Sequence, residues 1–218
     1  LMEKALELAE EDDNQQVIGL AKKNGSIASY NMAKGLYKAE KYDEAAKYYK
    51  KGMELDSMSA ANVNGLATVY FKQDKKDESF QTYIQAVKLY QAEKKAKSVK
   101  NIFKRLNFLV GKSYTSDNFD QAIEYGEQAL EIMPHASIAY YVSRAYLENG
   151  ENEKALEKAT IAVDQGMKDE AVEDKYYIAQ AMAYANLGQK AEAIEAYSKV
   201  KEGDYYEQAQ YQIKQLQG

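Results

Sequence analysis

Side chains able to carry catalysis or to hold a metal ion are scarce in this sequence. Cysteine is absent from the 218 residues and His135 is the single histidine. Thiol catalysis, thiolate metal sites and zinc-binding or charge-relay histidine pairs are therefore excluded. The acidic run 10–13 lacks the glycine and the alternate-residue spacing of a calcium loop. Glu192 and Glu195 have no partner base for acid–base work. We expect no catalytic residue, no metal site, no cofactor and no enzyme activity.

The distribution of charge also limits the classes of partner. The net charge of −5 argues against wholesale binding to phosphate backbones. The most basic run is 94–100, followed by Lys104 and Arg105, and a nucleic-acid or anionic-membrane contact is conceivable there. No stacking aromatics or nucleic-acid module accompany this run, so we interpret it as the solvated face of a lengthened helix. No stretch of 18 or more apolar residues is present.

Helices are the elements expected to position any binding residues. The sequence has one proline and 12 glycines, and Ala, Glu, Lys, Leu and Gln, which lose little rotamer freedom in a helix, dominate its long stretches. A pattern of small and aromatic residues recurs along it. The segment that begins at residue 29 aligns with the sequence 34 residues further along. The matching pairs are Ala33 with Ala67, Tyr37 with Phe71, Ala45 with Ser79, Tyr49 with Tyr83 and Gly52 with Ala86. Further copies surround Tyr114, Tyr146 and Tyr184.

These residues resemble the tetratricopeptide repeat, a helix–turn–helix unit of about 34 residues. The resemblance covers roughly residues 26–207, although no copy has the family's tryptophan and only Pro134 stands at the place of its closing proline. It implies an all-α, right-handed superhelical solenoid of antiparallel helix pairs with turns near residues 40, 74, 117, 150 and 188. The predicted parts are an N-terminal helical cap at 1–25, repeats at 26–59, 60–93, 94–136 with a basic insertion, 137–169 and 170–203, and a C-terminal capping helix at 204–218.

The two ends are predicted to differ from the repeats, because the terminal units of such an array need one polar outer face. At the N-terminus we expect two helical stretches, 1–10 and about 14–23. At the C-terminus, Tyr206, Ala209, Ile213 and Leu216 recur at helical spacing and predict one apolar stripe on a last helix. His135, which follows Pro134 at a repeat junction, is interpreted as structural or exposed.

In the family, the first helix of each repeat lines most of the concave surface where peptides bind. The register implied by the resemblance places a larger set of residues there, from which we predict as partner-binding Tyr30, Lys34, Tyr37, Lys38, Asn64, Thr68, Phe71, Lys72, Arg105, Phe108, Lys112, Tyr140, Arg144 and Lys175. Glu148, Ile178, Met182 and Asn186 share this register. Seven basic residues against one acidic residue indicate an acidic partner. The alternative is that the lysines are simply solvated and the tyrosines pack on their neighbours.

The predicted function is a non-catalytic scaffold or adaptor that binds a protein or peptide, expected to be acidic, and not nucleic acid. Chaperone-tail receptors of this family use a lysine and asparagine cluster, whereas this chain has Tyr30, Lys34 and Gly65 at such places, so we do not expect that function. The alternatives are a regulatory or docking portion of a larger enzyme or envelope assembly, or a module that assembles with itself as a homo-oligomer. The absence of cysteine and the start at Leu1 favour the bacterial periplasm or cell envelope over the cytoplasm.

Overall fold

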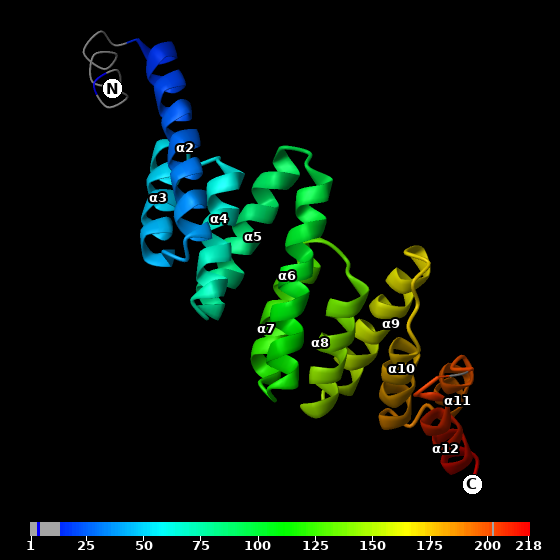
Figure 1. Ribbon diagram of the computed structural model, residues 1–218. Helices are drawn as coiled ribbons and strands as arrows, with labels where there is room; N and C mark the ends of the chain where they lie inside the picture. The colour runs from blue at the N-terminus through cyan, green and yellow to red at the C-terminus, as the bar shows by residue number, and fades with distance from the viewer. Residues whose placement is uncertain (1–3, 5–13, 202) are drawn as a thin grey trace. The chain divides into compact units, whose positions relative to one another are not determined.

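The computed structural model describes residues 4, 14–201 and 203–218, and this part of the chain is all-helical without strands (Figure 1). Its helices are α2 (Gln15–Lys38), α3 (Tyr42–Leu55), α4 (Ala60–Lys72), α5 (Lys76–Ala92), α6 (Ala96–Thr115), α7 (Phe119–Ile132), α8 (Ala136–Glu148), α9 (Asn152–Lys168), α10 (Asp174–Asn186), α11 (Lys190–Ser198) and α12 (Tyr206–Gln217). They form two compact units, unit 1 (residues 1–102) and unit 2 (residues 103–218). The predicted all-α class is confirmed.

Tight turns of one kind join the paired helices. At each turn one residue adopts the left-handed backbone conformation, and these residues are Glu40, Asp74, Asp117, Gly150 and Gly188, with φ between 56° and 75°. The residue after each of them donates its N–H to a carbonyl five residues back, as Lys41 does to Leu36 at 3.0 Å. This arrangement satisfies carbonyls that a helix end otherwise leaves unpaired. The predicted turn positions are confirmed.

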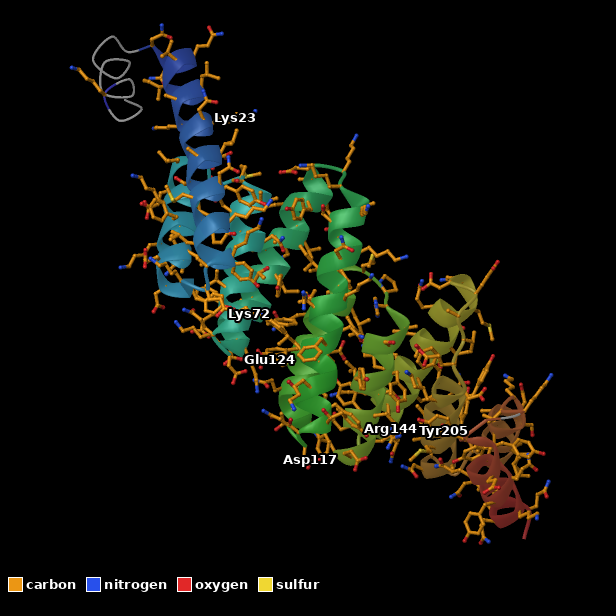
Figure 2. The ribbon with its side chains drawn as sticks, viewed as in Figure 1. Lys23, Lys72, Asp117, Glu124, Arg144 and Tyr205 are labelled. Carbon is orange, nitrogen blue, oxygen red and sulfur yellow. The ribbon has the colours of Figure 1, made fainter. Side chains whose placement is uncertain are left out.

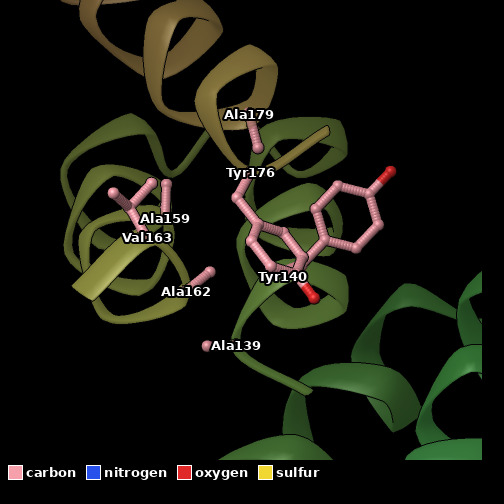
Figure 3. Close-up of a cluster of buried hydrophobic side chains, with 7 residues drawn as sticks. All are labelled: Ala139, Tyr140, Ala159, Ala162, Val163, Tyr176 and Ala179. Carbon is pink, nitrogen blue, oxygen red and sulfur yellow. The ribbon is translucent and has the colours of Figure 1, made fainter. Parts of the chain in front are cut away.

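Small residues and tyrosines fill the space between neighbouring helices. In unit 1, Ala33, Ala45 and Ala67 are completely buried, and a side chain at Gly65 would overlap the ring of Tyr49. In unit 2, helices α8, α9 and α10 bury a cluster in which tyrosine rings lie among alanines (Figure 3), formed by Ala139, Tyr140, Ala159, Ala162, Val163, Tyr176 and Ala179. The recurring alanines and glycines therefore permit close helix packing, and the aromatic rings occupy the remaining volume.

Helix α2, the first described helix, differs from the predicted division of this region. Helix α2 runs without a break through residues 25 and 26, the predicted boundary between cap and first repeat. Both Gly25 and Ser26 are buried, and the Ser26 hydroxyl donates to the Gly52 carbonyl at 2.8 Å. These small residues provide a helix contact rather than a break, which explains the continuous helix. The predicted stretch 1–10 lies outside the described residues, apart from Lys4.

The C-terminal helix α12 packs through part of its predicted stripe. Ala209 is buried, and Ile213 and Leu216 pack against the cluster that contains Ile178 and Tyr197. The prediction for Tyr206 is wrong, because its side chain is 40% exposed. Tyr205, at the position that precedes the helix, packs against the cluster instead. No helix in the described part of the chain is long and apolar enough to cross a membrane.

Candidate partner-binding surface

Unit 1 contains a cleft of about 270 Å³ between its first and third described helices. Helix α2 provides one wall, helix α4 the other, and α3 contributes a single side chain. The lining residues are Tyr30, Lys34, Tyr37, Lys38, Tyr49, Ala61, Asn64, Gly65 and Thr68. Six of the fourteen residues predicted to bind a partner, four on α2 and two on α4, thus lie together in one cleft.

Helical spacing explains why these side chains meet. Tyr30, Lys34, Tyr37 and Lys38 are separated by four, three and one residues, so they share one face of α2. Asn64 and Thr68 are one turn apart on α4. Ala33 on α2 and Ala67 on α4 are completely buried beside these residues.

The chemistry of the cleft is that of hydrogen-bond donors and aromatic rings. Lys34 and Lys38 are exposed, and none of the lining residues is acidic. The ammonium of Lys34 lies 5.9 Å from the ring centre of Tyr30, a favourable cation–π distance. The Thr68 hydroxyl donates to the Asn64 carbonyl at 2.8 Å and accepts from the Tyr83 hydroxyl at 3.2 Å. A group entering between the lysines therefore meets positive charge without a competing carboxylate.

Tyr49, a repeat residue that was not predicted to bind a partner, forms part of the cleft. Its side chain is 4% exposed and its ring centre lies 6.0 Å from that of Tyr30. Burial, with smaller contributions from Tyr30 and Tyr37, raises the pKa of the Tyr49 hydroxyl to about 12, so the hydroxyl stays protonated at neutral pH. A comparison of the first two repeats could have identified Tyr49 from the sequence, because Lys34 stands in the first repeat where Thr68 stands in the second.

The other predicted residues of unit 1 lie beyond this cleft. Phe71 is half-buried, and Lys72 is exposed at the C-terminal end of α4 (Figure 2). A second hollow of about 620 Å³ lies on α2 and the turn that follows it. It is lined by none of the predicted residues but by Ala28, Asn31, Met32, Gly35, Leu36, Ala39 and Lys41.

In unit 2, two of the predicted cations have carboxylate partners within the chain. Arg144 lies 3.6 Å from Glu148 and 5.9 Å from the ring centre of Tyr114. The Lys175 ammonium lies 2.7 Å from a Glu173 oxygen. Neither cation is simply solvated, because each has a carboxylate of the chain beside it.

The tyrosine and apolar residues of this unit are divided between core and surface. Tyr140 is 8% exposed and belongs to the core, with the Lys175 ammonium 5.3 Å from its ring centre. Ile178, placed by the family register on the concave surface, is buried at 1% exposure, so that placement is wrong. Burial against the last helices accounts for it. Arg105, Phe108 and Lys112 are exposed on α6.

His135 and the basic run 94–100 form contacts within the chain. His135 caps α8, because its Nδ1 accepts the N–H of Ile138 at 3.4 Å. Its ring stacks on Phe103 with ring centres 5.9 Å apart. In the basic run, Lys95 lies 2.6 Å from Glu93. Among the described residues, no group of three or more histidines and carboxylates could hold a metal ion.

Comparison with known families agrees with this geometry. A sequence profile described as tetratricopeptide repeat matches residues 30–94, 114–170 and 143–210, most of the chain. The chain belongs to the tetratricopeptide repeat family. The stretch 95–113 between the matches includes most of the predicted basic insertion. No curated protein matches the sequence.

Several solved structures of tetratricopeptide repeat proteins are similar at low sequence identity. The MamA protein is 17% identical, with 80% of this chain and 89% of that chain covered and a TM-score of 0.49. YrrB, described as having an unusual peptide-binding site, is 17% identical, with 91% of each chain covered and a TM-score of 0.47. The TPR2AB domain of yeast Sti1 in a pHSP90 complex is 14% identical, with 88% and 98% covered and a TM-score of 0.46.

Proposed function

We propose that this tetratricopeptide repeat protein is a non-catalytic scaffold or adaptor that binds an acidic peptide or protein segment, and that the unit 1 cleft is its principal contact. The observation that carries the proposal is the cleft itself. It joins Lys34 and Lys38 to tyrosine rings and to the side chains of Asn64 and Thr68, and no acidic residue lines it. Repeat arrays commonly present such surfaces to extended segments.

Two physical contributions would give the binding energy. The lysines attract carboxylates and increase the rate of encounter, and this contribution weakens as salt screens the charges. Tyr30 and Tyr37 offer ring surfaces that can pack against apolar residues of the partner. In unit 2, Arg144 and Lys175 already form ion pairs with Glu148 and Glu173. They are therefore expected to contribute less to the binding of an acidic partner.

The test uses an acetylated and amidated peptide of alternating glutamate and leucine, with its glutamine counterpart as the uncharged probe. Affinity is measured by fluorescence anisotropy for the native chain and for Lys34→Glu with Lys38→Glu. The matched control is Lys47→Glu with Lys88→Glu, which makes the same charge change at exposed positions outside the cleft.

We expect the native chain to prefer the glutamate peptide, and the cleft variant to weaken binding by at least about tenfold, as loss of close charge pairs does. The control should bind within about twofold of the native chain, because distant exposed charges are screened. Equal weakening by both variants would mean that net charge, rather than the cleft, determines binding, and would refute the proposal.

A further inference from the structure

We propose that the outer face of α2 in unit 1 docks an amphipathic helix of a partner protein, one with an alanine and leucine contact face and with glutamate or aspartate along one edge. The outer face includes the hollow of about 620 Å³ on α2 and the turn that follows it. It is a different face of α2 from the one that lines the cleft. The inference therefore goes beyond the proposed function and adds a second contact of another kind.

The first argument is that this outer face is apolar and uncovered. Leu20, Ala28, Met32 and Gly35 follow one another at spacings of eight, four and three residues, so they lie on one side of the helix. The Leu20 side chain is 60% exposed and that of Met32 is 52% exposed. Ala33, which α2 buries, lies on another side. Contiguous apolar surface that faces water is typical of a contact site.

The second argument is the shape of the outer face. The hollow is lined by the small residues Ala28, Gly35 and Ala39 and by the larger Met32 and Leu36. A Cβ atom added at Gly35 would meet no heavy atom within 4 Å, so the hollow is open there. Small residues let a second helix backbone approach closely, and the longer side chains beside them can pack between the turns of that helix. A helix therefore fits this hollow.

The third argument is the charge along one edge of the outer face. Lys23, Lys34 and Lys38 are eleven and four residues apart, so they follow the same edge, and all three are exposed (Figure 2). Lys34 and Lys38 stand between this face and the cleft. No acidic residue is present from Gln15 to Lys38. An acidic edge on the docked helix would pair with these lysines, whereas an antiparallel second copy would place its own lysines against them.

The test uses an acetylated and amidated peptide of alanine, leucine and glutamate that a lactam bridge holds helical, with its apolar residues on one face. One counterpart has lysine in place of glutamate, and the other has the same residues in an order that removes the apolar face. Affinity for the full chain is measured by fluorescence anisotropy. We expect the glutamate helix to bind at least about tenfold more tightly than either counterpart. Equal affinities would overturn the proposal.

The decisive variant is Gly35→Leu, which fills the hollow. Affinity for the glutamate helix should fall by at least about tenfold, while the melting temperature should rise, because leucine favours a helix more than glycine does. The matched control is Gly19→Leu, on the same helix but nearly on the opposite side, where an added Cβ also meets no heavy atom within 4 Å. This control should raise the melting temperature and keep the affinity within about twofold. Native affinity in Gly35→Leu, or an equal loss in both variants, would overturn the docking face.

Other occupants of the outer face would give different results. A native dimer in sedimentation velocity that Gly35→Leu dissociates would identify a second copy as the occupant and overturn the proposal. Binding of the glutamate helix only after Leu6→Glu with Leu8→Glu would assign the face to the chain's own residues 1–13, and would also overturn it.

The outer face and the cleft can fail separately. Gly35→Leu should bind the alternating glutamate and leucine peptide as the native chain does, because that peptide is expected in the cleft. If Lys34→Glu with Lys38→Glu leaves the alternating peptide bound while Gly35→Leu releases the glutamate helix, the proposed function fails and the docking face stands. The reverse pair of results would refute the docking face alone.

Discussion

Replacement of Asn62 by alanine should destabilise unit 1 by about 2 kcal/mol, because Asn62 joins three helices from a fully buried position. The side chain is 0% exposed. Its Nδ2 lies 2.9 Å from Ser26 Oγ on α2 and 3.0 Å from Ser59 Oγ, and the Ser26 hydroxyl continues to the Gly52 carbonyl on α3 at 2.8 Å. A third contact of Nδ2, with the Ser26 carbonyl at 3.3 Å, shares the same two amide hydrogens, so the loss of these hydrogen bonds costs about 2 kcal/mol in total.

Two smaller contributions nearly cancel. The volume vacated by the amide adds a cavity cost of under about 1 kcal/mol. Loss of Asn62 Oδ1, which is buried and lacks a partner among the described residues, returns a similar amount. The sum stays near 2 kcal/mol, and the same contacts hold α2 against α4 on either side of the cleft.

The assay is urea unfolding followed by far-ultraviolet circular dichroism, with Asn64→Ala as the matched control. Asn64 lies on the same helix but is half-buried, and no side-chain hydrogen bond to a described residue holds it, so its replacement should change the unfolding free energy by less than about 0.5 kcal/mol. The two variants should therefore separate stability from binding. Equal unfolding free energies for Asn62→Ala and Asn64→Ala would refute the structural role assigned to this network.

Two other predictions concern the turns and the histidine. Asp74→Gly and Asp117→Gly should each raise the unfolding free energy by about 0.5–1 kcal/mol, because the two residues have left-handed φ angles of 56° and 57° that glycine adopts without strain. A lower melting temperature, or a lower unfolding free energy in urea, would contradict this prediction. Burial lowers the pKa of His135 from its ordinary 6.5, so its folded form is preferentially neutral. Its contribution to stability is therefore present above about pH 6.5 and is lost as the pH falls through the lowered pKa. His135→Asn keeps a capping side chain and should remove that pH dependence of the unfolding free energy, measured in urea. If the unfolding free energy of the variant depends on pH as that of the native chain does, the role given to His135 is wrong.

Much of the fold could be predicted because the repeat places small and aromatic residues at fixed positions. Ala33 and Ala67 mark where helices approach closely, and the turn residues lie where the helical pattern is interrupted. The continuous α2 could not be predicted in the same way. Gly25 and Ser26 stand at the predicted boundary, but both are buried within α2, and Ser26 forms hydrogen bonds with Gly52 on α3 and Asn62 on α4, contacts between distant residues.

The candidate site was predictable in part for the same reason. Residues on one helix face follow from spacing, so the α2 and α4 members of the cleft could be chosen from the sequence. Tyr49 was missed because it lies on a second helix, and the family pattern gives that position to the core. The pairing of Lys175 with Glu173, which lies just before α10, also depends on side-chain geometry that spacing does not reveal.

The central claim, that an acidic segment binds in the unit 1 cleft, is tested most directly by backbone amide NMR during titration with the blocked glutamate peptide. We expect the largest chemical-shift changes around Lys34, Lys38, Asn64 and Thr68, and weaker changes when salt is raised. Shift changes confined to α6 or α12, with the cleft residues unmoved, would contradict the account.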